Sequence, residues 1–210
     1  MWYLEKNKLI SPIQNGFRKN RSTIDHLVRF ESVLREASIK NLHTVAIFFD
    51  IEKAYDTTWK HGILQDLQDL HLQGHLPNFI QKILIDRKFS VRLLNHMSDE
   101  YDQETGVPQG SIISTTLFII KINNITKSLP PNVHQFLYVD DFVICYSSSN
   151  MNIIERKLQQ TIYKLEQWAD LNGFKFSQDK TKVIHFCHKR KLHPDPELYL
   201  NKHLFLSLKK

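Results

Sequence analysis

The pattern of apolar positions predicts a long helix followed by a buried strand. Apolar residues recur at helical spacing from residue 24 to residue 37, behind Ser22 as an N-cap with an acid in the first turn. The run at 45–49 is apolar without alternation, which is typical of a central strand buried on both faces. This strand ends at Asp50, so the first part of the chain predicts a helix packed on a sheet.

The middle of the chain predicts mostly helices. Apolar residues at helical spacing predict two helices in this region, and Gly74 and Pro77 separate them. Apolar residues that alternate with polar ones at 89–93 predict a strand. A turn-rich segment at 106–110 leads into the last helix, which Pro130 stops. The predicted elements are helix 59–72, helix 78–87, strand 89–93 and helix 111–128.

The last third predicts a hairpin with two adjacent acids, Asp140 and Asp141, at its tip. The clearest amphipathic helix of the chain follows and ends at Asn172-Gly173, a C-cap signal. The mixture of strands and helices lacks strict βαβ alternation, which favours an α+β domain. The predicted elements are strand 135–140, strand 142–146, helix 153–169, strand 174–177 and strand 183–186.

Composition adds an excess of positive charge. The 210 residues include 28 Lys and Arg against 22 Asp and Glu, a formal net charge of +6. This excess suits a polyanionic partner without proving one. Two cysteines are too few for a disulfide framework, and the eleven histidines show no metal-ligand spacing. No signal peptide is visible and no apolar run approaches the ~18 residues of a membrane span, so we expect an intracellular protein, in the nucleus or the cytoplasm.

Three carboxylates, Asp50, Asp140 and Asp141, follow predicted strands. Adjacent acids repel each other unless a cation lies between them, and carboxylate oxygens are ligands for hard divalent cations. Two such ions ~3.5–4 Å apart are a common arrangement for in-line phosphoryl transfer. Taken singly, each acid is more often an ordinary turn residue, so the combination carries the interpretation.

Five motifs span roughly residues 14 to 187 of the chain. They are Gly16-Phe17-Arg18 with Arg21-Ser22-Thr23, Phe48 to Asp56, Gly106 to Ser111, Tyr138-Val139-Asp140-Asp141, and Gly173 to Ser177 with Lys180-Thr181-Lys182. The fourth resembles the catalytic box aromatic-x-Asp-Asp of reverse transcriptases. In their order and spacing the five together resemble the reverse transcriptase family, and they are most similar to non-LTR elements of the LINE type, in particular the Jockey kind.

The resemblance implies a metal site and a reaction. Asp50, Asp140 and Asp141 are the implied metal ligands, and the backbone carbonyl of Ile51 completes one shell. The implied cofactor is a pair of Mg²⁺ ions, with Mn²⁺ as the alternative. The resemblance further implies an RNA template, a DNA primer and dNTPs as partners, with no protein partner inferable. Lys180 resembles the lysine that protonates departing pyrophosphate, although Lys182 competes for that role.

Further residues are implied to bind the substrate. Tyr55 stands where the family places the steric gate that excludes a ribose 2′-hydroxyl, or else it is a core aromatic residue. Gln109 and Gly110 match the loop beside the incoming nucleotide, or an ordinary turn before a helix. Arg18 and Arg21 match residues that contact nucleic acid or triphosphate, or they belong to a solvated basic loop.

The implied domain organisation is a polymerase palm, an antiparallel sheet backed by helices, with partial fingers and no thumb. We predict partial fingers at 1–40, the palm with inserted fingers helices at 41–187, and a truncated or divergent tail at 188–210. The predicted function is RNA-directed DNA synthesis. The alternatives are an inactive remnant that at most binds nucleic acid, a viral RNA-dependent RNA polymerase, against which Tyr55 argues, and a plain basic α+β domain.

Overall fold

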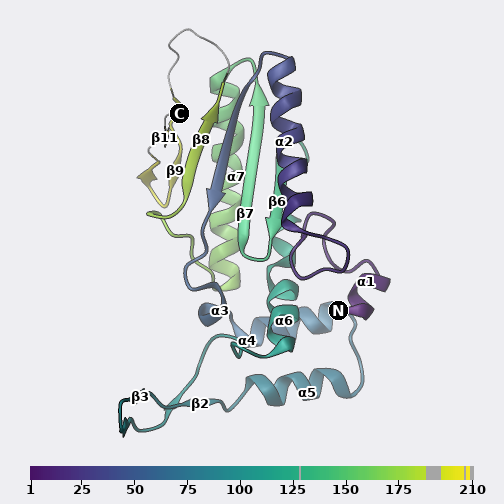
Figure 1. Cartoon of the computed structure of the whole chain (residues 1–210), viewed down its shortest axis with the longest axis vertical. Coiled ribbons are helices and arrows are strands. Elements are labelled where there is room, and N and C mark those ends of the chain that lie inside the picture. Colours follow the sequence, from purple (N-terminus) through teal and green to yellow (C-terminus); the bar gives the residue numbers. More distant parts are fainter. Residues whose placement is uncertain (128, 188–194, 206, 209–210) are drawn as a thin grey trace. The chain divides into compact units, whose positions relative to one another are not determined.

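The computed structural model describes residues 1–127, 129–187, 195–205 and 207–208 and divides the chain into two compact units (Figure 1). The first unit comprises Met1–Glu52 and Ile122–Lys210, and the second comprises Lys53–Lys121. These units group residues by contact, whereas the predicted boundaries between fingers, palm and tail stay a prediction.

A five-stranded sheet forms the centre of the first unit. Its order is β11-β8-β1-β7-β6, with all neighbours antiparallel except β11, which runs parallel to β8. The predicted central strand is confirmed, because β1 lies between β8 and β7 and six of its seven residues are buried. The strands are β1 (His43–Phe49), β6 (His134–Tyr138), β7 (Asp141–Ser148), β8 (Lys182–Phe186) and β11 (Ser207–Leu208).

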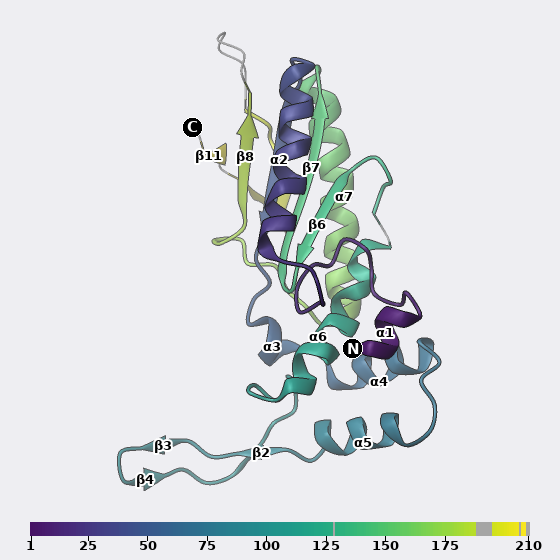
Figure 2. The same cartoon turned by 45° about the vertical axis from the view of Figure 1, so that its right-hand side comes forward.

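Helices α2 (Thr23–Ile39) and α7 (Met151–Asn172) cover opposite faces of this sheet (Figure 2). Helix α2 packs Phe30 and Val33 against a buried cluster that includes Ala46 of β1, while α7 lies against β7 and β1. Both predicted helix signals are confirmed. Ser22 and Asp25 form a capping box at the start of α2, and Gly173 ends α7 with a φ of 73°.

The sheet is accompanied by short elements. Phe174 to Ser177 was predicted as a strand, but in the structure it makes a single antiparallel bridge, between Phe176 and Ile51. The remaining elements of the first unit are α1 (Trp2–Lys6), the 3₁₀ helix η1 (Asn123–Thr126), β9 (Tyr199–Leu200) and β10 (His203–Leu204).

The second unit is built mainly of helices: α3 (Ala54–Thr57), α4 (Lys60–Asp69), α5 (His75–Leu84) and all but the last residue of α6 (Ile112–Ile122). The prediction that Pro77 lies before the second helix was wrong, since α5 begins at His75. Proline is tolerated there because the N–H groups of a first helical turn have no intrahelical partner. Helix α6 ends sooner than predicted, and the predicted endpoint, Ser128, lies outside the described residues.

The predicted strand 89–93 is instead part of an exposed double hairpin. Strand β2 (Lys88–Phe89) pairs with β5 (Tyr101–Asp102), and β3 (Arg92–Leu93) pairs with β4 (His96–Met97). All four strands are exposed, so the apolar alternation here does not mark a core-facing strand. Within the described part of the chain, no helix combines the length and the apolar character that a membrane crossing requires.

Candidate active site

The sheet brings the three predicted carboxylates to one of its ends. Asp50 directly follows β1 and Asp141 begins β7, and the neighbouring residues Phe49 and Phe142 are register partners. Asp140 lies in the turn between β6 and β7, immediately before Asp141. Residues 90 positions apart in sequence therefore meet because two antiparallel strands place their ends together.

The electrostatics of this sheet end reflect the repulsion among three acids. Partial burial of the Asp141 carboxyl raises its pKa above the usual range, and the negative charges of Asp140 and Asp50 raise it further. Oδ2 of Asp50 is buried and accepts no hydrogen bond within the described residues. A buried carboxylate oxygen without a donor is costly, and a bound cation would offset that cost.

The backbone around Asp50 is held by the segment that follows α7. The carbonyl of Asp50 accepts a hydrogen bond of 2.8 Å from the N–H of Ser177, and its own N–H donates to the hydroxyl of Thr181 at 3.3 Å. Ile51 bridges Phe176 in an antiparallel pair, and on the other side of this pair the N–H of Glu52 donates to the carbonyl of Lys175 at 2.8 Å. The hydroxyl of Thr181 is a contribution that sequence reasoning missed.

The structure separates the two candidate lysines. The ammonium nitrogen of Lys180 lies 3.8 Å from Oδ2 of Asp50, and 73% of its side chain is exposed. The ammonium of Lys182 donates instead to the carbonyl of Asp179 at 2.5 Å. Lys180 is thus the lysine beside the carboxylates.

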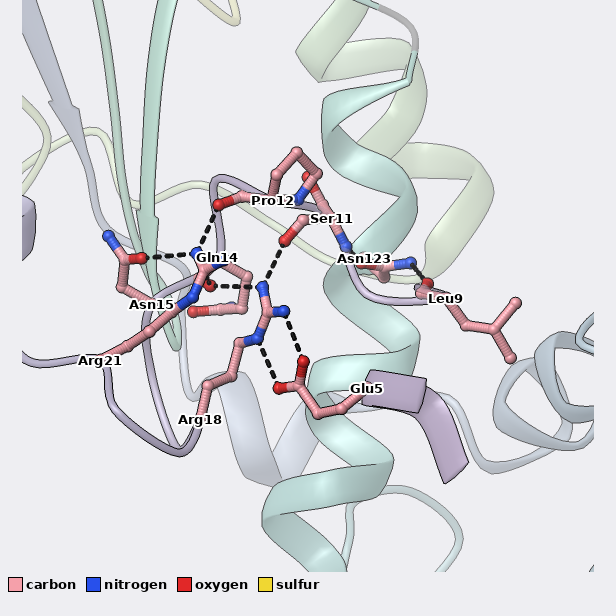
Figure 3. Close-up of polar contacts among 9 residues, drawn as sticks. All are labelled: Glu5, Leu9, Ser11, Pro12, Gln14, Asn15, Arg18, Arg21 and Asn123. Carbon is pink, nitrogen blue, oxygen red and sulfur yellow. Dashed lines mark hydrogen bonds and ion pairs between the residues drawn. The ribbon is translucent and has the colours of Figure 1, made fainter. Parts of the chain in front are cut away.

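Arg18 and Arg21 make internal contacts in the segment between α1 and α2 (Figure 3). The side chain of Arg18 is 8% exposed and donates two hydrogen bonds to the carboxylate of Glu5, at 2.7 and 2.6 Å, which lower the pKa of that glutamate. Its remaining bonds go to the carbonyls of Ser11 and Gln14, at 2.9 and 3.0 Å. Contact of Arg18 with nucleic acid or triphosphate stays a prediction, and it would have to compete with this ion pair.

Arg21 is used in a similar way. Its guanidinium donates to the carbonyls of Pro12 and Gln14, at 2.5 and 3.3 Å, and to the Asn15 side chain at 2.9 Å (Figure 3). Both arginines therefore hold the segment before α2 in its folded path, a role that the basic residues alone did not reveal.

The second unit assembles the residues predicted to bind the incoming nucleotide. The ring of Tyr55 stacks on Phe118, with centroids 4.6 Å apart and an interplanar angle of 18°. The amide of Gln109 donates to the carboxylate of Asp56 at 2.6 Å, and the N–H of Val107 donates to the carbonyl of Tyr55 at 2.9 Å. The loop 106–110 thus lies against α3, the helix that carries Tyr55, and Gly110 has a φ of 87°.

A second group of chemically versatile side chains lies at the other end of β1. The potential metal-ligand atoms of His43, His185 and Cys187 all lie within 4.8 Å of one another. Among the described residues, these three side chains form the one group of this kind. The sequence spacing did not indicate it, because His43 and His185 come from different strands. Nδ1 of His43 lies 3.1 Å from Nε2 of His185, and Nδ1 of His185 lies 3.4 Å from Oδ1 of Asp195.

Comparison with known proteins agrees with the motifs. The family described as reverse transcriptase (RNA-dependent DNA polymerase) matches residues 2–203. The RNA-directed DNA polymerase from mobile element jockey of Drosophila funebris is 30% identical over 171 residues, covering 79% of this chain and 19% of that protein. Its counterpart in Drosophila melanogaster is 26% identical over 188 residues, covering 87% of this chain and 20% of that protein. The chain spans about a fifth of the length of these relatives.

Solved structures share the fold. Apo telomerase from Candida tropicalis, truncated from its C-terminal domain, matches with a TM-score of 0.65 at 16% identity, covering 90% of this chain and 39% of that one. Telomerase from the same organism in complex with a TWJ fragment of telomeric RNA matches with a TM-score of 0.61 at 15% identity, covering 87% and 32%. The α+β palm predicted from the sequence is confirmed. The match to the family covers nearly the whole chain, from residue 2 to residue 203, and the fold is one that a telomerase shares. The chain therefore belongs to the reverse transcriptase family.

Proposed function

We propose that this chain contains the polymerase centre of an RNA-directed DNA polymerase of a non-LTR retrotransposon. The reaction adds a deoxynucleotide to the 3′-hydroxyl of a DNA primer paired with an RNA template. The observation that supports it most is the meeting of Asp50, Asp140 and Asp141 at one end of the sheet in a member of the reverse transcriptase family.

The donor set suits hard divalent cations. The Asp50 oxygen that accepts no hydrogen bond and the raised pKa of Asp141 both indicate a concentration of negative charge at this end of the sheet, which the exposed ammonium of Lys180 offsets only from one side. Asp50, Asp140, Asp141 and the carbonyl of Ile51 would hold two Mg²⁺ ions, or Mn²⁺ in their place. Bound there, the ions would lower the pKa of the primer 3′-hydroxyl and offset the charge on the leaving pyrophosphate.

Lys180 supplies the proton in this proposal. Its ammonium group lies next to Asp50 yet is mostly exposed, so it can reach a departing pyrophosphate and protonate it. Lys182 is the weaker candidate because its ammonium donates to the carbonyl of Asp179.

Tyr55 and the loop 106–110 would select and orient the nucleotide. Stacking on Phe118 holds the Tyr55 ring in one orientation, as a residue that rejects a 2′-hydroxyl by its bulk requires. Gly110 has no heavy atom within 4 Å of the position that a Cβ would take, so its backbone leaves room for close approach of a ligand. Gln109, now bonded to Asp56, offers an amide that can exchange that partner for a substrate group.

Nucleic acid is the macromolecular partner that the charge favours. The formal net charge of +6 attracts phosphates in a salt-dependent manner, and Arg18 and Arg21 are the basic residues of the motif upstream of α2. We infer an RNA template and a DNA primer, with dNTPs as the small substrates.

Primer extension tests this function. We would measure extension of a DNA primer on an RNA template with Mg²⁺ and dNTPs, comparing the native chain with Asp140→Asn and, as a matched control, Asp170→Asn on the exposed side of α7. Extension that disappears only in Asp140→Asn supports the proposal. Absence of extension by the native chain, without rescue when the thumb of a related element is fused to it, favours the inactive remnant.

A further inference from the structure

The turn that carries the Asp-Asp pair is strained. Tyr138 and Asp141 are paired in the β6–β7 hairpin, which leaves Val139 and Asp140 as a two-residue loop. Val139 has a φ of 59°, a region that β-branched residues avoid and that hairpin turns usually fill with Gly or Asn. Strain of this kind persists only where the surrounding structure imposes it, and it concentrates at functional sites.

The contacts that impose it come from Gln14, more than a hundred residues earlier in the chain. Oε1 of Gln14 accepts a hydrogen bond of 2.9 Å from the N–H of Val139, and Nε2 donates to the carbonyl of the same residue at 3.2 Å. The same Oε1 also accepts a bond of 2.8 Å from the N–H of Gly16. Gln14 is completely buried, so water does not compete for these bonds.

The backbone around Gln14 follows the edge of the sheet beside this turn. Gln14 forms a parallel bridge with Leu137 of β6, and the N–H of Asn15 donates to the carbonyl of Leu137 at 2.9 Å. At Gly16 a Cβ would lie 2.3 Å from Cγ2 and 2.7 Å from the backbone nitrogen of Val139. Glycine is therefore needed for this close approach.

The position of Gln14 is in turn secured from its other side. Its backbone carbonyl accepts hydrogen bonds from both Arg18 and Arg21 (Figure 3). Asn123 anchors the start of the same segment by accepting from the N–H of Ser11 at 2.7 Å and donating to the carbonyl of Leu9 at 2.9 Å. Gln14 thus connects the hydrogen bonds of Arg18 and Arg21 to the turn formed by Val139 and Asp140.

We propose that Gln14 is a positioning residue of the polymerase centre. By bridging the N–H and C=O of Val139 it holds the turn in its strained form and so aims Asp140 and Asp141 toward Asp50 for joint binding of divalent cations. This inference rests on the proposed function, because the carboxylates need a fixed direction only if they bind metal together. A buried amide that merely stabilises the fold is the competing explanation.

The test uses Gln14→Met, which keeps the length of the side chain but removes both polar atoms. Ile154→Ala is the matched control, since Ile154 is fully buried in the first turn of α7, which begins three residues after Ser148, the end of β7 remote from the turn. Two quantities would be measured on the whole chain: Mn²⁺ binding, from the electron paramagnetic resonance signal of free Mn²⁺, and hydrogen exchange of the Val139 amide by NMR. Thermal unfolding midpoints would be measured for both variants. The control is valid if Ile154→Ala is destabilised at least as much as Gln14→Met.

We expect Gln14→Met to bind Mn²⁺ about 10–100-fold more weakly, the range typical of residues that orient metal ligands, and to lose protection at Val139. Ile154→Ala should bind Mn²⁺ as the native chain does. If Gln14→Met binds Mn²⁺ as tightly as the native chain while Asp140→Asn does not bind it, the inference is overturned and the proposed function stands. Equal binding by the native chain and Asp140→Asn would instead refute the metal site, and the inference with it.

Discussion

The ammonium nitrogen of Lys180 lies 3.8 Å from Oδ2 of Asp50, a buried oxygen that accepts no hydrogen bond within the described residues. This placement sets the lysine that we propose as the proton donor beside the carboxylates, and the proposal has a kinetic consequence. Replacing Lys180 with Met should lower the rate of nucleotide addition by about 10²–10⁴-fold, the usual contribution of general acid catalysis. The apparent KM for dNTP should change little.

Single-turnover extension with Lys180→Met and Lys182→Met would check this prediction. The Lys182 variant should lose far less, because that ammonium donates to the carbonyl of Asp179. The reverse order of the two rates would assign the proton donor to Lys182 instead.

Asp141 should lower the stability of the metal-free chain. Burial and two neighbouring acids raise its pKa, so the folded chain binds a proton more readily than the unfolded chain does. Stability contributed by the protonated form is therefore lost as pH rises from the ordinary Asp pKa of about 3.9 through the raised folded value. Asp141→Asn removes this loss.

Thermal unfolding in the presence of a chelator would measure the effect at several pH values. At neutral pH the midpoint of Asp141→Asn should lie slightly above that of the native chain, by a small margin because solvent reaches this side chain. Near pH 3 the two midpoints should converge. A variant that is less stable at neutral pH would show that Asp141 makes net favourable contacts in the fold.

The sequence predicted those parts of the fold that depend on local signals. The capping box at Ser22, the apolar run of β1 and the Asn-Gly end of α7 each specify an element within a few residues, and each is confirmed. The hairpin tip also follows from local pattern, since two β-prone runs enclose Asp140 and Asp141.

The contacts that the sequence did not predict join distant segments. The bond between Gln14 and Val139 spans 125 positions, and nothing in the residues around Gln14 shows which backbone its amide will meet.

Periodicity also misleads where apolar residues stay in solvent. Ile24 and Leu27 fit the pattern of α2 but are 68% and 62% exposed. A periodic position predicts the helix without saying which of its residues contact the sheet.

Gly16 should tolerate no side chain, because a Cβ there would overlap with Val139. Gly16→Ala should lower the free energy of unfolding by about 1–3 kcal/mol, as overpacking does. Gly110→Ala is the useful comparison, since a Cβ there meets no atom within 4 Å and its cost comes only from a φ of 87°. Denaturant titration would compare the two. A Gly16 variant as stable as the native chain would mean that the turn gives way easily.

Tyr55 should control the choice of sugar. Replacing it with Ala removes the ring that stacks on Phe118 and should raise the relative efficiency of ribonucleotide incorporation by about 10–200-fold, the range for a single steric contact in a pocket. Steady-state kcat/KM for a dNTP and its matching rNTP would be compared. Unchanged discrimination, with reduced stability, would identify Tyr55 as a core aromatic residue.

We propose that carboxylates from two neighbouring strands form one metal-dependent polymerase centre. The most direct measurement is incorporation of a single deoxynucleotide on an RNA template with Mg²⁺, compared among the native chain, Asp50→Asn and Asp140→Asn. We predict that each substitution alone removes nearly all incorporation while the fold is retained, because both strands contribute ligands to the same ions. Incorporation at the native rate by either variant would contradict the account.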